Sequence, residues 1–160
     1  PKTPKPRSFG RNIIINMFLR TIKRLPYKNR NFSTLVLAEH FEGKLNMSIA
    51  QCLKAAQELN DPHVSLLEFL FLVDVLVHGS DDSVKAQVSE VKKFPGITKI
   101  YSATSGELDN PYGGSVSILA KNLIEKNGYD KVIALSSSFG KDVIPRIGGL
   151  LDLQAITDVI

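Results

Sequence analysis

The chain has 160 residues, 43% hydrophobic and 22% charged, so it is long enough for one globular domain and lacks the polar bias of disorder. Its net charge of +4 is unevenly spread: residues 1–38 contain nine Lys and Arg and no acid, and the rest contains eleven basic and all sixteen acidic residues. This mildly acidic body has no basic stripe interleaved with aromatics, which argues against nucleic-acid binding. Glu68 and Asp74 break the longest apolar run, so we expect no membrane insertion.

The basic N-terminal segment has the composition of a targeting sequence. Residues 17–30 interleave basic and apolar side chains without one acid, as mitochondrial transit peptides do. We therefore expect residues 1–32 to be a leader and transit peptide, with the mature protein starting near Ser33. The alternative is a basic arm without regular structure.

The first strand and helix are expected directly after this segment. Residues 33–39 form a continuous apolar run, which is typical of a strand covered on both faces. Apolar side chains then recur at helical spacing, and Asn60-Asp61-Pro62 ends the helix; the apolar positions are Ile49, Cys52, Leu53 and Ala56. Cys52 is the single cysteine, so an internal disulfide is excluded and a buried thiol is expected.

Strand and helix patterns continue to alternate to the end of the chain. The expected order is a strand within 66–77, a helix at 82–92 starting at Asp81-Asp82, a strand at 97–103, a helix at 116–127, a strand at 132–135, a helical stripe over 143–151 and a strand beginning at 155. The segments that link successive strands are too long for hairpins, so they imply parallel strands joined by right-handed crossovers. The predicted fold class over residues 33–160 is therefore α/β, doubly wound, with a mostly parallel sheet.

The loop after the fourth strand is the first place to look for a ligand in such a sheet. It reads Ser-Ser-Ser-Phe-Gly-Lys-Asp over residues 136–142, but a phosphate loop needs glycine where Leu135 stands and Ser or Thr where Asp142 stands. We interpret it as a tight turn with a serine cap, with Pro145 in the first helical turn. The glycine-flanked elbow of serine hydrolases is missing as well.

The histidines and glycine pairs are interpreted as structural residues and not as catalytic or binding residues. His40, His63 and His78 are scattered, with no His-Glu-x-x-His run or cysteine pair, so no metal site is predicted. Gly113-Gly114 is interpreted as part of a loop, because the third glycine that a phosphate-binding turn requires is missing. Gly148-Gly149 falls inside an apolar helix, where it would permit close packing rather than hold a phosphate.

Two stretches together resemble the electron transfer flavoprotein alpha subunit. Phe-Ser-Thr-Leu-Val-Leu-Ala-Glu-His, residues 32–40, is similar to the first strand of that family, directly after its transit peptide. Residues 138–147 and 153–160 resemble the family's Gly-Lys/Arg-Asp-x-x-Pro-Arg element and the strand that follows it. By order of elements the resemblance covers residues 33–160, with an apparent insertion around residues 70–73.

The resemblance implies a non-catalytic part of a mitochondrial matrix electron carrier. In that family the alpha subunit forms a heterodimer with a beta subunit, takes electrons from acyl-CoA dehydrogenases of fatty acid beta-oxidation and passes them through FAD to a quinone oxidoreductase of the respiratory chain. The family's flavin-binding residues follow the position of Ile160, so the resemblance implies that this segment carries no catalytic, cofactor-binding or metal residue and that the FAD domain is absent from it. The segment itself would be the scaffold and subunit-interface domain.

The Gly-Lys-Asp-x-x-Pro-Arg element supplies the candidate structural or interface residues, which are Phe139, Gly140, Lys141, Pro145 and Arg146. Arg146 could pair with a carboxylate or cap carbonyls of an adjoining segment, or be an exposed helix charge. Two other functions stay open. One is a nucleotide-binding module of the universal-stress or adenine nucleotide alpha hydrolase-like type, a three-layer sandwich with this element order; the other is a degenerate fragment without a function of its own.

Overall fold

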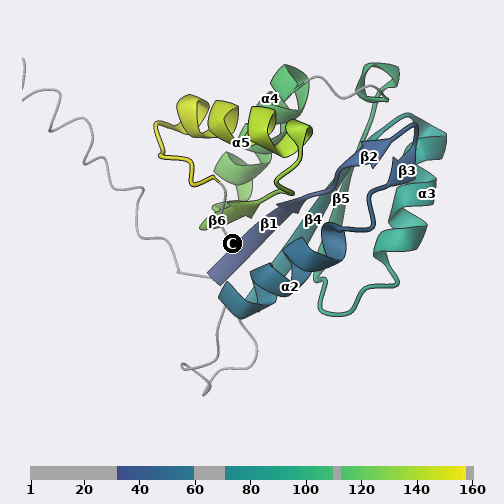
Figure 1. The fold of residues 1–160 in the computed structure, drawn as a ribbon, viewed down its shortest axis with the longest axis horizontal. Helices are drawn as coiled ribbons and strands as arrows, with labels where there is room; N and C mark the ends of the chain where they lie inside the picture. Colours follow the sequence, from purple (N-terminus) through teal and green to yellow (C-terminus); the bar gives the residue numbers. More distant parts are fainter. Residues whose placement is uncertain (1–31, 60–70, 110–112, 158–160) are drawn as a thin grey trace, which may run out of the picture. The chain divides into compact units, whose positions relative to one another are not determined.

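Four apolar segments form one parallel sheet in a computed structural model, which describes residues 32–59, 71–109 and 113–157 (Figure 1). The strands are β1 (Phe32–Leu37), β4 (Phe71–Gly79), β5 (Lys99–Thr104) and β6 (Lys131–Ile133). Their order across the sheet is β5-β4-β1-β6, and every neighbouring pair is parallel. The predicted α/β class is confirmed.

Helices cover both faces of this sheet. The helices α2 (Ile49–Leu59) and α3 (Asp81–Val91) pack on one face, and α4 (Gly113–Asn127) and α5 (Ser138–Leu151) pack on the other (Figure 1). Two small elements were not predicted: an antiparallel hairpin of β2 (His40–Phe41) and β3 (Lys44–Leu45), and the short 3₁₀ turn η2 (Gly106–Leu108). The hairpin follows β1 and η2 follows β5, both at the carboxyl edge of the sheet.

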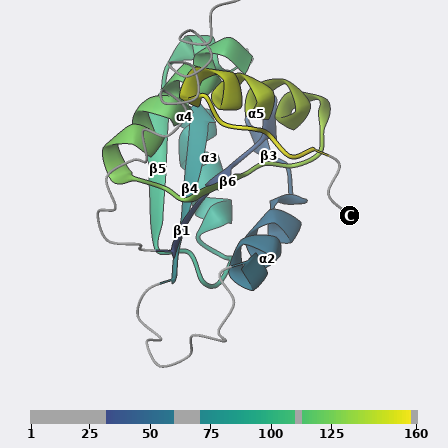
Figure 2. The same ribbon diagram turned by 90° about the vertical axis from the view of Figure 1, so that its left-hand side faces the viewer.

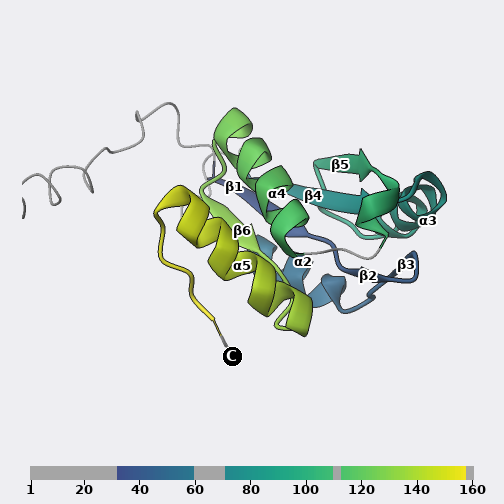
Figure 3. The same cartoon turned by 90° about the horizontal axis from the view of Figure 1, so that it is seen from above.

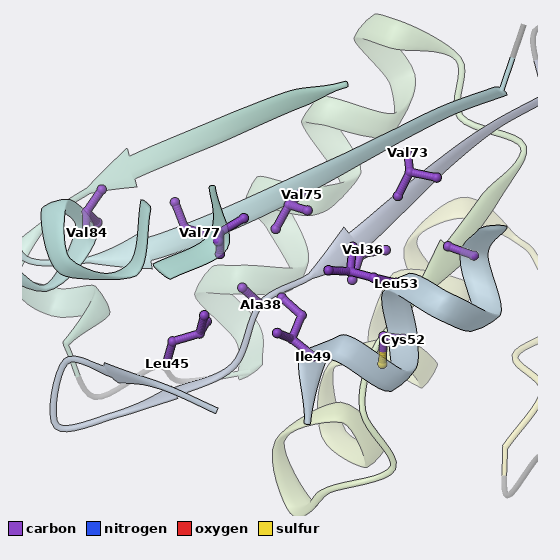
Figure 4. Close-up of a cluster of buried hydrophobic side chains, with 12 residues drawn as sticks. Val36, Ala38, Leu45, Ile49, Cys52, Leu53, Val73, Val75, Val77 and Val84 are labelled. Carbon is purple, nitrogen blue, oxygen red and sulfur yellow. The ribbon is translucent and has the colours of Figure 1, made fainter. Parts of the chain in front are cut away.

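The strands read as continuous apolar runs because their alternate side chains serve two separate cores. Val36 and Ala38 face α2 and α3, whereas Leu35 and Leu37 face α4 and α5. Figure 4 shows the first core, where valines of β4 meet Ile49 and the other apolar side chains of α2. Cys52 lies in this core as expected, and burial raises the pKa of its thiol.

The chain after α5 differs from the prediction of a fifth strand beginning at residue 155. Asp152 adopts a left-handed conformation with φ of 54°, and the Leu153 backbone N–H donates to the carbonyl of Gly148 at 2.9 Å. This turn directs residues 153–157 back along α5 instead of into the sheet, and they have no regular secondary structure (Figure 2). Gly148 permits the contact, since a Cβ there would lie 2.8 Å from the Leu153 carbonyl oxygen.

Several sequence predictions fall on residues that the structure does not describe. They are the leader and transit peptide, His63, and the part of the apparent insertion that precedes Phe71. Within the described ranges, no helix is both long enough and apolar enough to cross a lipid bilayer.

Candidate functional site

The start of α5 lies tightly against the end of β6, at the carboxyl edge of the sheet. The Ser137 hydroxyl accepts a hydrogen bond from the Gly140 backbone N–H at 3.1 Å, which is the predicted serine cap. Gly140 has no room for a side chain, because a Cβ would overlap the Leu135 carbonyl oxygen and lie 3.0 Å from its carbon. The glycine of the motif is therefore required for the helix to begin so close to the strand exit.

Phe139 covers a buried pair of histidines that the sequence analysis had treated as scattered. The Phe139 ring centroid lies 5.6 Å from that of His78, and His40 Nε2 lies 3.2 Å from His78 Nδ1. His40 Nε2 is also 3.1 Å from the carbonyl oxygen of Leu108. A carbonyl only accepts, so a proton on His40 Nε2 is the arrangement that satisfies both neighbours.

Both imidazoles are neutral in this site near pH 7. His40 is 3% exposed and His78 is fully buried. Burial, together with the neighbouring His40, lowers the pKa of His78 from 6.5 to about 4. Burial also lowers the pKa of His40, although the Leu108 carbonyl and the charges of Asp109 and Glu39 partly oppose it. Neutral rings shielded from solvent lack the accessible proton exchange that general acid–base catalysis requires.

The end of β4 is fixed to the start of α3 by polar contacts. Asp109 Oδ1 accepts from the Ser80 backbone N–H at 2.8 Å and from the Ser83 hydroxyl at 2.9 Å, and these bonds lower the Asp109 pKa. Gln87 Nε2 donates to the carbonyl oxygen of His78 at 2.8 Å. The helix begins at Asp81, as predicted, with two carboxylates at its positive end.

The acidic and basic residues of the α5 motif pair with each other. Arg146 Nε donates to Asp142 Oδ1 at 2.8 Å within α5. Asp142 also lies against Gly113, because a Cβ at Gly113 would overlap Asp142 Oδ2 and lie 2.8 Å from Cγ. The interpretation of Gly113-Gly114 as a loop is therefore wrong: both belong to the first turn of α4, where Gly113 makes room for the carboxylate.

Two other motif residues, Lys141 and Pro145, lie on the outer surface of α5. Lys141 is exposed, and so is Pro145. Pro145 stands in the helix interior and not in the first turn as predicted, because the Ser137 cap starts the helix at Ser138. A proline there removes one backbone bond, and water can reach the carbonyl on this exposed side.

At the starts of α4 and α5, groups of the chain itself occupy positions where a pyrophosphate could bind. One backbone N–H of the first α5 turn is already taken by the Ser137 hydroxyl. The start of α4 is covered by the Asp142 carboxylate, which would repel a second anion. Within the described ranges, no group of three or more His, Cys, Asp and Glu side chains could hold a metal ion.

The histidine pair and a buried tyrosine–aspartate contact are the polar features that sequence reasoning missed. Tyr129 Oη donates to Asp74 Oδ2 at 2.5 Å, and Asp74 is 3% exposed in the central strand β4. One signal could have found both: His40, Asp74 and His78 are polar residues placed in or directly after apolar runs. In a parallel sheet such positions have to be buried, and a buried polar group needs a partner.

Comparisons with known proteins agree with this fold. The family model described as "Electron transfer flavoprotein domain" matches residues 34–160. Curated relatives include the "Electron transfer flavoprotein subunit alpha, mitochondrial" of Oryza sativa subsp. indica, which is 35% identical over 81% of this chain. The protein of that name from Arabidopsis thaliana is 29% identical over 82% of the chain, and a probable one from Cryptococcus neoformans var. grubii is 31% identical over 83%.

The match covers most of this chain but a limited part of its relatives. The chain spans about a third of their length, namely 35%, 34% and 36% for the rice, Arabidopsis and Cryptococcus proteins. Because the family model covers residues 34–160, almost the whole region in which the sheet and its helices are described, the chain belongs to the electron transfer flavoprotein domain family.

Proposed function

We propose that residues 33–160 are the N-terminal scaffold and subunit-interface domain of a mitochondrial electron transfer flavoprotein alpha subunit. The observation that carries this proposal is the family match over residues 34–160, together with relatives named as that subunit. The domain itself is non-catalytic, and the complex that contains it carries electrons from acyl-CoA dehydrogenases to a quinone oxidoreductase in the matrix. FAD is held by a second domain that corresponds to the remaining length of the relatives.

The scaffold role is supported by what the motif residues contact. Gly140 and Asp142 make close contacts within the domain, at Leu135 and Gly113 respectively. The Phe139 ring packs against His78 in a tilted arrangement, and the histidine pair is buried. The family motif thus fixes the carboxyl edge of the sheet and leaves Lys141 and Pro145 outside.

The interface role is supported by exposed apolar side chains at the end of α5. Leu150, Leu153 and Ile156 are 44%, 60% and 78% exposed, and they follow one another along α5 and the segment beside it. Large apolar side chains grouped in this way mark surfaces that bind other proteins. We propose that they contact the beta subunit.

The interface proposal is tested by binding of the chain to the beta subunit encoded in the same genome. Leu153→Asp combined with Ile156→Asp should weaken the association at least about tenfold, as loss of buried apolar contacts does. Ile118→Asp on α4 is the matched control, because Ile118 is 56% exposed and lies outside this group. Equal binding by both variants would remove the interface from this surface. Arg146→Ala, assayed in parallel, tests whether the motif arginine takes part.

Two further measurements test the finer parts of the proposal. Fluorescence titration of the chain with FAD should give no saturable binding, and titration with ATP and AMP should give none either. Saturable binding of a nucleotide would favour the competing nucleotide-binding function, which the Asp142 carboxylate at the start of α4 argues against. Fusion of residues 17–32 to a reporter tests the transit peptide, and retention of the reporter in the cytosol would contradict it.

A further inference from the structure

A shallow groove runs between α3 and the edge strand β5, away from the motif helix α5. Two adjoining hollows of about 600 and 480 Å³ form it, and they share Val88, Lys92 and Ser102. Figure 3 shows α3 beside β5, the last strand on that side of the sheet. The groove therefore combines a helix face with an open strand edge.

The open edge of β5 is suited to accept another strand. Among the described strands β5 pairs with β4 alone, so the backbone groups on its other edge face no strand. Its sequence, Lys-Ile-Tyr-Ser-Ala-Thr, contains the β-formers Ile, Tyr and Thr and neither Pro nor an acidic residue. The opposite edge strand, β6, has three residues against the six of β5. Proteins protect free strand edges with prolines, bulges or charged side chains. In β5 there is no proline, and the one charged residue is Lys99 at its start.

The side chains along the groove define what it would bind. Val84, Val88 and Ile100 provide an apolar floor, and Ser102 adds a hydroxyl. Lys85 is paired with Asp81 and Asp82 at 3.8 and 3.7 Å. Lys92 and Lys99, in contrast, have no ion pair among the residues that the structure describes. Two lysines without an ion pair beside the apolar floor of the groove favour an acidic ligand.

We propose that this groove binds an acidic, extended peptide segment of a partner protein, which adds to β5 as a strand. Main-chain hydrogen bonds to the β5 edge supply affinity. Every second side chain of the added strand faces the groove, where apolar ones pack on its floor and carboxylates meet Lys92 and Lys99. The proposal goes beyond the electron-carrier function and does not depend on the motif in α5. A second copy of this chain fits less well, because β5 contains no carboxylate to offer the lysines.

The test uses the full chain and a fluorescein-labelled heptapeptide, Glu-Thr-Val-Thr-Val-Thr-Glu, whose Glu and Val side chains share one face of an extended strand. Fluorescence anisotropy should show saturable binding that weakens with salt. Lys92→Glu combined with Lys99→Glu should raise Kd about tenfold, as two exposed charge pairs would. Lys126→Glu, an exposed reversal on α4 at the other face of the sheet, is the matched control and should leave Kd unchanged. On peptide binding, amide hydrogen exchange should slow in β5.

Four results would overturn the proposal. They are no saturable binding of the acidic peptide, equal binding of a peptide with Lys in place of each acid, an unchanged Kd in the lysine variant, and binding without slower exchange in β5. Sedimentation of the free chain gives the remaining check. A concentration-dependent dimer with slowed β5 amides would assign the groove to a second copy instead. The thermal midpoints of both variants should match that of the unmodified chain, because every changed side chain is exposed.

Discussion

The carboxylate of Asp142 in α5 occupies the space in which Gly113, the first residue of α4, would carry a side chain. The same carboxylate accepts a hydrogen bond from Arg146 at 2.8 Å. The start of one helix and the second turn of the other are thereby joined through a single charged group. An anion at a helix N-terminus is stabilised by the helix dipole, so the contact is favourable as well as close.

Gly113→Ala should destabilise the domain by about 1–2 kcal/mol, because the new methyl group displaces the Asp142 carboxylate from α4 and from Arg146. In an Asp142→Ala background the same substitution should cost little, since the obstacle is gone. Urea unfolding of the two single variants and the double variant gives the coupling energy, expected to be at least about 1 kcal/mol. Additive effects within about 0.3 kcal/mol would contradict the contact.

Gly140→Ala should be much more damaging, by about 3 kcal/mol or more, because its methyl group meets the backbone carbonyl of Leu135, which cannot rotate away. Gly149→Ala is the matched control in the same helix. A Cβ at Gly149 would have nothing within 4 Å, so alanine should stabilise the domain by up to about 1 kcal/mol through helix propensity. Thermal unfolding monitored by circular dichroism should therefore move in opposite directions for the two variants. A similar midpoint for both would show that the α5 start does not need glycine.

The structural roles of Gly113 and Gly140 could not be predicted from the sequence. The order of strands and helices followed from apolar runs and helical spacing, because a parallel sheet between helices imposes those periods on the sequence. The roles of Gly113 and Gly140 did not follow, because each depends on an atom from another element, Asp142 Oδ2 and the Leu135 carbonyl. A close approach between elements leaves no periodic signal.

The prediction of a strand from residue 155 was wrong for a similar reason. Apolar residues at 155–160 predicted a strand, yet the left-handed residue Asp152 and the bond from Leu153 to Gly148 decide the direction of the chain there. Asp tolerates a left-handed conformation better than most residues do. Its presence alone does not show which way the chain turns, because that depends on the space that Gly148 leaves on α5.

Acid should destabilise the domain through the buried histidines. The pKa of His78 is about 4 in the folded state against 6.5 as its ordinary value, so as pH falls below 6.5 the unfolded state takes up the proton first. The stability is complete above pH 6.5 and falls by up to about 3 kcal/mol as pH approaches 4. His40 shifts in the same direction, with Asp109 and Glu39 as the nearby opposing charges.

His78→Asn isolates this effect, since an amide oxygen can still accept from His40 Nε2 without titrating. Urea unfolding at pH about 7 and about 5 should show a smaller loss of stability in the variant than in the unmodified chain. The comparison is of pH slopes, so any constant cost of the substitution cancels. A variant with the slope of the unmodified chain would mean that carboxylates, and not this pair, set the acid sensitivity.

Tyr129→Phe should destabilise the domain by about 1–3 kcal/mol, because it removes the hydroxyl that donates to Asp74 Oδ2. Among the described residues Asp74 Oδ1 has no hydrogen-bond partner, so the variant would leave a buried carboxylate without this donor. Burial and the contact with Asp74 raise the pKa of Tyr129, which keeps the hydroxyl protonated as a donor over the whole working range of pH.

The double variant Asp74→Leu with Tyr129→Phe distinguishes a lost hydrogen bond from lost packing. Replacing both polar partners by apolar ones removes the unsatisfied group, so the double variant should be more stable than Tyr129→Phe alone. Free energies of unfolding from urea titrations measure the difference. If the double variant is instead less stable than either single variant, the ring position matters through its packing against the core, and the buried carboxylate has another source of compensation.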